Sequence, residues 1–346
     1  MTAPSSFSGL LGRLLGRERI DTTDFRAAFD AILAGAWTPV QVGAFAVALR
    51  MRGESAEELV AAAQAMRAAM TLVEHDLPVV ADTCGTGGDG SQTLNLSSAA
   101  AIVVAACGVP VAKHGNRSIS SRCGSADVIE ALGIPIDVQP SRQRDVLREA
   151  GIVFLFAPAH HPAMKHAAQA RAELGARTIF NVLGPLANPA RATHQLVGVY
   201  DDELRSIVAH ALGTLGIRRA WVVRGKDGLD EVSPCGPTRV SELTEDGAVR
   251  ERTVAPEDFG MAPVDRAAFA GGDAPANARA LIAILAAEPH PARDAVILNA
   301  AAALAVVTGA PLPACAERAR DAIKSGSAHA TLGRWRSAAA RARAAS

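Results

Sequence analysis

Two stretches decide the fold of this chain: Asp82-Thr-Cys-Gly-Thr-Gly-Gly-Asp-Gly90, and Lys113-His-Gly-Asn-Arg-Ser-Ile-Ser-Ser121. Each follows an apolar run typical of a strand and precedes an apolar run typical of a helix, which begins near Ala99 in one case and near Gly124-Ser-Ala-Asp127 in the other. Glycines let backbone N–H groups approach a phosphate closely, and a following helix aims its N-terminal donors at the same place. The pair of loops therefore predicts a phosphate pocket.

The two loops together indicate more than either loop alone. A glycine-rich turn after a strand is often only a tight connection. Lys113 and Arg117 beside a glycine cradle match a ligand with several phosphates, whereas a structural turn has no use for both charges. No Gly-Lys-Ser/Thr sequence closes the first loop, and its glycines do not have the spacing of a dinucleotide-binding fingerprint.

Composition favours a cytoplasmic protein whose partners are small molecules. The 35 basic residues balance the 35 acidic residues, so we expect no general attraction to nucleic acid or to an anionic membrane. The five cysteines are scattered without a C-x-x-C pair, which argues against a disulfide framework or a zinc site. No uninterrupted apolar run reaches about 18 residues, and residues 1–20 mix leucine with arginine and contain no signal-type apolar core.

The first seventy residues carry helix signals that predict a small all-α unit. Three sets of cap residues predict three helices: Thr23 before residues 24–35, Thr38-Pro39 before a helix that ends at Gly53, and Ser55-Ala-Glu-Glu58 before one that ends at Met70. We place this helical domain at residues 1–77.

The remainder, residues 78–346, is predicted to be a large α/β domain. Strand-like runs occupy residues 79–83, 109–113, 134–137, 152–156, 196–200 and 220–223, with helical stretches between most of them. Such alternation predicts a mainly parallel central sheet that is covered on both faces. Residues 241–254, with Asp246-Gly247 at the turn, predict a hairpin. Three further helices are expected after it, with residues 338–346 as a solvated helix end.

The motifs resemble the anthranilate phosphoribosyltransferase family of tryptophan biosynthesis. The resemblance rests on the two loops and on Gly124-Ser-Ala-Asp127, and it covers nearly the whole chain. It continues through residues 154–158, 161–165, 173–175, 177–186, 228–233 and 256–260. It implies that helices from about residues 161–181 pack on the helical domain and that the active site lies in the cleft between the two domains. It also implies a homodimer that forms through the helical domain.

The implied reaction moves the 5-phosphoribosyl group of phosphoribosyl pyrophosphate onto the amine of anthranilate. The donor would be held by Gly85, Gly88, Asp89, Thr93, Asn95, Leu96, Ser97 and Ser98 in and after the first loop, and by Lys113, His114, Gly115, Asn116, Arg117, Ser118, Ile119, Ser120, Ser121 and Ser125 around the second. Lys113 and His114 are the candidate catalytic residues. His161 is also expected near the substrate, although aniline nitrogen has an available lone pair and needs no strong base.

The resemblance further implies Mg²⁺, with Asp230, Glu231 and Ser97 as its ligands. An adjacent acidic pair in a glycine-rich loop is by itself usually a solvated turn, but magnesium does prefer hard oxygen ligands and substrate phosphates. For anthranilate, the resemblance implies Gly85, Asn116 and Arg171. A planar guanidinium can donate two parallel hydrogen bonds to a carboxylate, whereas Arg171 alone would be interpreted as a surface arginine on an amphipathic helix.

Three short segments depart from the usual family pattern. Arg122-Cys123 replaces a usual Lys-Ser, Gln169-Ala170 replaces Pro-Val before the arginine, and Leu96-Ser-Ser98 replaces Ile-Ser-Thr. None removes a residue named above as a ligand.

Two alternative functions stay open at this point. A pyrimidine nucleoside phosphorylase would share the fold and a lysine-containing phosphate loop, but Asp230-Glu231 and Arg177-Thr-Ile-Phe-Asn181 favour the phosphoribosyltransferase. A non-enzymatic, nucleic-acid-binding paralogue would be expected to show a basic surplus and a degraded phosphate loop, and the chain shows neither.

Overall fold

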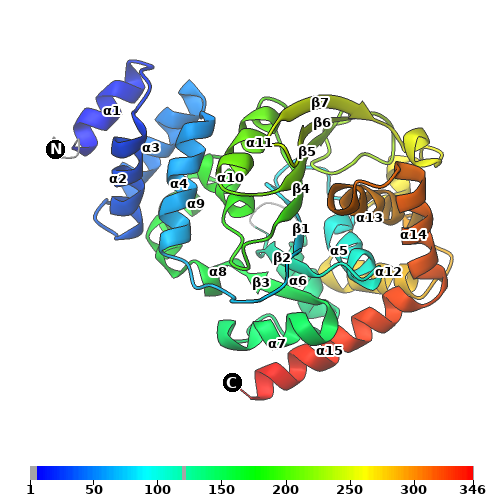
Figure 1. Ribbon diagram of the computed structural model, residues 1–346. Coiled ribbons are helices and arrows are strands. Elements are labelled where there is room, and N and C mark those ends of the chain that lie inside the picture. Colours follow the sequence, from blue (N-terminus) through cyan, green and yellow to red (C-terminus); the bar gives the residue numbers. More distant parts are fainter. Residues whose placement is uncertain (1–5, 119–121, 346) are drawn as a thin grey trace.

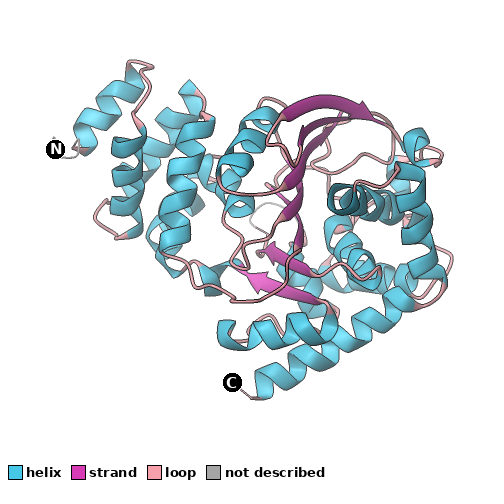
Figure 2. Ribbon diagram, in the orientation of Figure 1, coloured by secondary structure: helices cyan, strands magenta, loops and turns pink. Residues whose placement is uncertain are grey.

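A seven-stranded sheet runs through the centre of the molecule, with helices on both sides (Figures 1 and 2). The computed structural model describes residues 6–118 and 122–345. The strand order is β3-β2-β1-β4-β5-β6-β7, and the first five strands of this order are parallel. The strands are β1 Ala81–Gly85, β2 Val111–Gly115, β3 Ile152–Phe156, β4 His194–Gly198, β5 Arg219–Gly225, β6 Thr238–Leu243 and β7 Val249–Val254. The predicted mainly parallel sheet is confirmed.

Four helices precede the sheet and form one side of the molecule (Figure 1). They are α1 Phe7–Leu15, α2 Thr22–Leu33, α3 Pro39–Arg52 and α4 Ala56–Ala68. The predicted caps at Thr38 and Ser55 are confirmed, and both form capping boxes. The predicted cap at Thr23 is wrong. Asp21, two residues earlier, accepts a hydrogen bond from Asp24 N at 2.9 Å and starts α2 there, which places Thr23 inside the helix.

The predicted strand at residues 134–137 is absent. This segment connects α6 Ser125–Ala131 to α7 Pro140–Ala150 without joining the sheet. Ile134 and Ile136 are buried, which explains the strand-like alternation, but Pro135 between them has no N–H to donate to a ladder. The predicted hairpin, by contrast, is confirmed, because β6 and β7 pair antiparallel around the turn at Asp246-Gly247.

Four α-helices follow the hairpin, not the three that were predicted: α12 Ala274–Leu285, α13 Arg293–Thr308, α14 Leu312–Lys324 and α15 Ser327–Ala344. The expectation of a solvated end is also wrong for the described part of the tail. Helix α15 lies along α7 (Figure 1), and Ala338, Ala339 and Ala342 are buried there. Arg341 and Arg343 are exposed, but they pair with Glu149 of α7 and with Asp137 just before it.

The sheet separates two hydrophobic cores. One core packs α5 Leu96–Ala106, α13 and the other C-terminal helices against one face of the sheet. The second core contains α1–α4, α9 Lys165–Leu174, α10 Ile179–Leu186 and α11 Leu204–Thr214, together with buried residues of β4 and β5. The N-terminal helices therefore share a single core with one face of the sheet. A short helix, α8 Ala157–His160, follows β3. Within the described residues, no helix has the length and apolar character needed to span a membrane.

Candidate active site

The two predicted loops lie side by side at the carboxyl ends of neighbouring strands. The first follows β1 and leads into α5, and the second follows β2 and leads into α6. Strands β1 and β2 pair only at their start, where Ala81 lies opposite Val111, whereas β1 pairs with β4 along its whole length. The two strands therefore diverge toward the edge where ligands bind in open α/β sheets.

The glycine loop after β1 is tied to the acidic pair, which lies far away in the sequence. Gly87 N donates to Asp230 Oδ2 at 3.0 Å, and Asp230 N donates to Asp89 Oδ2 at 3.3 Å. Gly198, at the end of β4, makes this approach possible, because a methyl group there would overlap the backbone carbonyl of Asp230. The predicted donor residues Gly85, Gly88 and Asp89 and the predicted metal ligand Asp230 are thus brought together.

The carboxyl groups of the acidic pair, Asp230 and Glu231, both have raised pKa values. Burial raises the pKa of Asp230 well above its usual value, and repulsion from Asp89 and Glu231 adds to the shift. Burial also raises the pKa of Glu231 to about 7, although the charge of Lys113 opposes this. Ser97 N donates to Glu231 Oε1 at 3.1 Å, which places the third predicted metal ligand beside the pair. A divalent cation would relieve this repulsion.

These carboxylates do not form a complete metal cage. Among the described residues, no three His, Cys, Asp or Glu side chains are arranged to hold an ion by themselves. Magnesium commonly binds through one or two carboxylates together with substrate phosphates and waters. The oxygen ligands present at Ser97, Asp230 and Glu231 fit that mode.

Lys113 points inward, toward the acidic pair. Its side chain is buried, and Nζ donates to the backbone oxygen of Thr83 and to Ser97 Oγ, the latter at 3.4 Å. Burial lowers the pKa of Lys113, and the nearby Asp82 carboxylate opposes the shift. The ammonium group therefore balances charge beneath the site and faces Ser97.

Asp82 is a site residue that the sequence did not single out. It accepts hydrogen bonds from His114 N at 3.2 Å and from Asn188 Nδ2 at 2.8 Å, and Asn188 also donates to Ala112 O at 2.8 Å. Asp82 and Asn188 thus bridge β1 and β2 where their backbones have separated. The signal was a charged residue inside a strand that is otherwise buried.

His114 and His161 lie with their ring centroids 5.1 Å apart. Burial lowers the pKa of His114 well below its usual value and that of His161 to about 4, so both rings are neutral near pH 7. Nδ1 of His114 lies 3.0 Å from Gly184 O, and this bond requires a proton on Nδ1. His114 is therefore a neutral hydrogen-bonding group and does not supply charge to a phosphate.

The second loop is held mainly by its own neighbours. Asp127 accepts from Gly124 N at 2.8 Å, from Ser118 N at 3.3 Å and from Arg117 Nη1 at 2.8 Å. Arg117 also pairs with Glu130 at 2.6 Å, so its guanidinium is neutralised locally. The predicted residues Ile119, Ser120 and Ser121 lie outside the described residues.

Further hydrogen bonds hold the second loop in place and connect it to the segment after the first loop. Ser125 Oγ accepts from Asn116 N at 3.2 Å, and the same hydroxyl would collide with any side chain at Gly115. Asn95 Nδ2 donates to Cys123 O at 3.2 Å. Cys123 Sγ donates to Asn95 Oδ1 at 3.3 Å, so this departure from the usual serine keeps a hydrogen-bonding side chain facing the amide.

The other predicted donor residues support the start of α5. Leu96 and Ser98 are buried in the first turn of α5, where their side chains pack in the interior of the protein. Thr93 pairs by a backbone bridge with Ala270, which connects the end of the glycine loop to the segment before α12.

Two arginines, one on α9 and one just before α10, have no acidic partner among the described residues. Arg171, on α9, lies with its guanidinium 5.9 Å from the ring centroid of Phe180, and burial lowers its pKa. Arg177, just before α10, lies 4.8 Å from the ring centroid of Tyr200 and against Gly88 of the glycine loop. Arg177 and Tyr200 were not among the predicted ligands.

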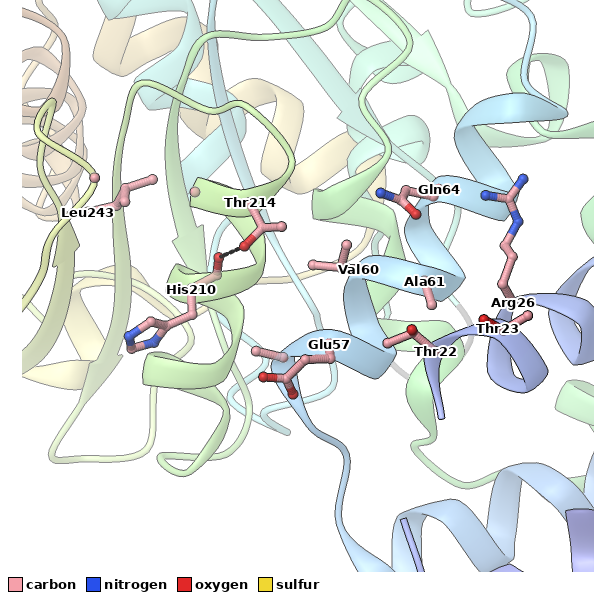
Figure 3. Close-up of a pocket in the computed structure, with 13 residues that line it drawn as sticks. Thr22, Thr23, Arg26, Glu57, Val60, Ala61, Gln64, His210, Thr214 and Leu243 are labelled. Carbon is pink, nitrogen blue, oxygen red and sulfur yellow. Dashed lines mark hydrogen bonds between the residues drawn. The ribbon is translucent and has the colours of Figure 1, made fainter. Parts of the chain in front are cut away.

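A separate groove of about 880 Å³ lies between α2, α4, α11 and the β6–β7 hairpin (Figure 3). Its described lining includes Arg26, Glu57, Gln64 and His210, and none of the predicted site residues. His210 and Thr214 come from α11, and Glu57 and Val60 come from α4 on the other side of the groove (Figure 3). This groove is therefore distinct from the loops.

The helical bundle, the sheet and the paired loops define a class of transferase, and the chain belongs to the glycosyl transferase family. The family's helical bundle domain matches residues 8–70, and its a/b domain matches residues 77–329. The family resemblance that the motifs predicted is confirmed.

Individual relatives are closely similar over almost the full length. The anthranilate phosphoribosyltransferase of Myxococcus xanthus is 50% identical over 323 residues, which cover 93% of this chain and 96% of that protein. The enzyme of the same name from Methylobacterium radiotolerans is 51% identical over 330 residues and covers 95% of both chains.

Solved structures show the same relationship. The crystal structure of anthranilate phosphoribosyltransferase from Thermus thermophilus has a TM-score of 0.89 at 39% identity and covers 95% of this chain and 99% of that one. The Saccharomyces cerevisiae enzyme in complex with PRPP and Mg has a TM-score of 0.89 at 29% identity, with 97% and 98% covered.

Proposed function

We propose that this protein transfers the 5-phosphoribosyl group from phosphoribosyl pyrophosphate to the amine of anthranilate. The products are N-(5-phosphoribosyl)anthranilate and pyrophosphate, which places the reaction in tryptophan biosynthesis. The observation that carries the proposal is the contact between the glycine loop and the acidic pair at Asp230, beside a second loop suited to phosphates. Similarity over nearly the full length to enzymes of this name supports it.

The donor site is proposed at the two loops. Because pyrophosphate leaves with several negative charges, the site has to position and neutralise it rather than attack it. Backbone N–H groups of the glycine loop are the proposed donors for that purpose. At the start of α5, Ser97 N already donates to Glu231 and Ser98 N to Asn95 O, so this helix end contributes its dipole rather than free N–H groups. Lys113, from below, keeps positive charge near Ser97 and Glu231.

Mg²⁺ is the proposed cofactor, held by Asp230, Glu231 and Ser97. When bound, the ion would neutralise charge on the departing pyrophosphate. The supporting observation is that Asp230 and Glu231, both half-buried, have raised pKa values, and that the charge of Lys113 opposes the shift at Glu231. Without an added cation, the charged forms of the pair are unfavourable there.

The acceptor is proposed to lie between Arg171 and Asn116, near Gly85. Arg171 is half-buried and has no carboxylate partner among the described residues, and burial lowers its pKa, which makes an unpaired charge costly. The carboxylate of anthranilate would satisfy it with two parallel hydrogen bonds. On this basis, Arg171→Ala should raise the KM for anthranilate far more than the KM for phosphoribosyl pyrophosphate, and equal effects would remove Arg171 from the acceptor site.

We also propose a homodimer that forms through the helical domain. Val40, Val47 and Met51 lie on one face of α3 and are exposed, and Leu15 of α1 is exposed as well. Light scattering on the purified protein should give twice the monomer mass, and Val40→Glu with Met51→Glu should give the monomer. A monomeric unmodified protein would contradict the proposal.

The deciding experiment mixes the protein with anthranilate, phosphoribosyl pyrophosphate and Mg²⁺ and follows loss of anthranilate fluorescence. A parallel sample contains EDTA. Loss that depends on metal supports donor, acceptor and cofactor together. If folded protein consumes no anthranilate, the next assay is phosphorolysis of a pyrimidine nucleoside, the alternative that shares this fold.

A further inference from the structure

We propose that Tyr200 is a positioning residue for donor binding, because its ring holds Arg177 against the glycine loop. Tyr200 follows β4 and is buried, with a relative exposure of 6%. The Arg177 guanidinium lies 4.8 Å from the Tyr200 ring centroid, a distance at which a cation is attracted to the face of an aromatic ring. Neither residue is among those predicted to bind phosphoribosyl pyrophosphate, anthranilate or the metal ion.

Arg177 is in direct contact with the middle of the glycine loop. Any side chain at Gly88 would collide with Arg177 Nε, and Gly88 has φ +78°, a conformation that favours glycine. The guanidinium therefore packs on the loop backbone itself. Among the described residues, Arg177 forms no ion pair, so its contacts are the Tyr200 ring on one side and the backbone of Gly88 on the other.

Tyr200 also holds the start of the same loop. Its backbone N donates to Thr86 Oγ1 at 3.0 Å, and Thr86 N donates to Gly198 O at 2.9 Å. One residue thus reaches the loop at two points, at Thr86 through its backbone and at Gly88 through its ring and Arg177. Both contacts limit the positions that the loop can take before a ligand arrives.

The ring is in turn connected to the helical domain. Arg50 of α3 lies 5.5 Å from the Tyr200 ring centroid and pairs with Asp201 at 2.8 Å. Glu54 lies 3.9 Å from Arg50, which adds a second carboxylate on that side. The position of α3 is therefore linked to the position of the donor loop.

The hydroxyl group of Tyr200 takes no part in this arrangement. It is buried and has no hydrogen-bond partner among the described residues. The inference therefore assigns the effect to the aromatic ring. Two variants can therefore test the role of the ring. Tyr200→Phe keeps the aromatic ring, and Tyr200→Leu removes it while keeping an apolar side chain.

The test measures the KM for each substrate in Tyr200→Phe, Tyr200→Leu, Arg177→Met and the double variant Tyr200→Leu/Arg177→Met. We expect Tyr200→Leu and Arg177→Met each to raise the KM for phosphoribosyl pyrophosphate roughly 3- to 30-fold, with little change for anthranilate. Tyr200→Phe should match the unmodified protein. The double variant should be no worse than the poorer single variant, because both remove one interaction.

Three results would overturn the inference: an unchanged donor KM in Tyr200→Leu, equal rises for both substrates, or additive effects in the double variant. A purely structural role would lower the unfolding temperature without this separation of the two KM values. If Tyr200→Leu fails to fold, Arg177→Met alone decides the result.

The inference rests on the proposed donor site, and its failure is distinguishable from failure of the proposed function. If the unmodified protein consumes anthranilate and the variants behave like it, only the inference is wrong. If the unmodified protein is inactive, the proposed function is wrong. Calorimetric titration of each protein with Mg²⁺ and phosphoribosyl pyrophosphate then tests the loop without turnover, and equal affinities would reject the role of Tyr200.

Discussion

The two phosphate loops occupy equivalent places after neighbouring strands, yet they are held in different ways. The loop after β2 is fixed by Asp127, which lies 3 residues from Gly124 and 10 from Arg117. The loop after β1 is fixed by Asp230, which lies 143 residues from Gly87. One loop is thus a local structure, and the other depends on the assembled sheet. A defect in the second loop should stay local, whereas a defect around the first should reach the proposed metal site.

The largest expected effect comes from replacing the two acidic residues, Asp230 and Glu231, that lie against the glycine loop. Asp230→Asn with Glu231→Gln removes the proposed metal ligands and should reduce turnover at least about 100-fold. The fold should survive, because desolvation disfavours the charged form of both carboxyl groups and the amides carry no charge. Steady-state rates at several Mg²⁺ concentrations check this. The exposed Glu257→Gln serves as the control, and an unchanged rate and Mg²⁺ dependence would reject the assignment.

A smaller but still large effect is expected from a single methyl group at Gly198. Gly198→Ala would push the backbone of Asp230 away from the glycine loop and should destabilise the protein by about 1–3 kcal/mol, as overpacking does. Activity should fall even where the protein stays folded. Gly236→Ala is the matched control, since nothing lies within 4 Å of its added methyl. Equal unfolding temperatures and rates for the two variants would contradict this account.

Asp127→Ala should have a weaker effect, confined to the second loop. It removes acceptors for two backbone N–H groups and the partner of Arg117, a change comparable to losing a helix cap, about 1 kcal/mol. The KM for phosphoribosyl pyrophosphate should rise on the order of 10-fold with Mg²⁺ dependence unchanged. An altered Mg²⁺ dependence would show that the two loops are not independent.

The smallest effect is a pH dependence of the second loop. Although burial opposes it, hydrogen bonds from Gly124 and Arg117 hold the pKa of Asp127 below its usual value. A carboxyl group with a lowered folded-state pKa stabilises the fold above its unfolded pKa of about 3.9, and this contribution is lost as pH falls through the folded-state pKa. Asp127→Asn should therefore cost more stability at pH 6 than at pH 3, and the difference between the two proteins should shrink as pH falls below about 3.9. Urea unfolding across that range measures the difference, and a constant gap would contradict it.

The difference between the two loops also explains which features could be predicted from local sequence patterns: those signalled by nearby residues were predicted, and contacts between distant residues were not. Both loops, their strands and the caps at Thr38 and Ser55 were predicted because each signal lies within a few residues. The meeting of Asp230 with Gly87 has no local signal, since an acidic pair in a glycine-rich turn is ordinary on a surface. Only the family resemblance indicated a function for that pair.

The missed features are those that depend on packing across the sheet. Asp82 and Asn188 act because β1 and β2 diverge, and sequence patterns do not show where strands separate. Ile134 and Ile136 alternate like a strand because the core buries them, although Pro135 prevents a ladder. Lys113 was expected to face phosphate, but the structure buries its ammonium group between Thr83 and Ser97.

The shared core of α1–α4 with β4 and β5 has a consequence for unfolding. Phe29 of α2 contacts Phe180 of α10 with ring centroids 5.8 Å apart, so the N-terminal helices bury apolar surface against segments from the middle of the chain. Removed from that surface, residues 6–77 would expose much of their apolar side. The helical unit is therefore not an autonomous foldon, and its amide protons should exchange with solvent together with those of α10 and α11, in one cooperative opening.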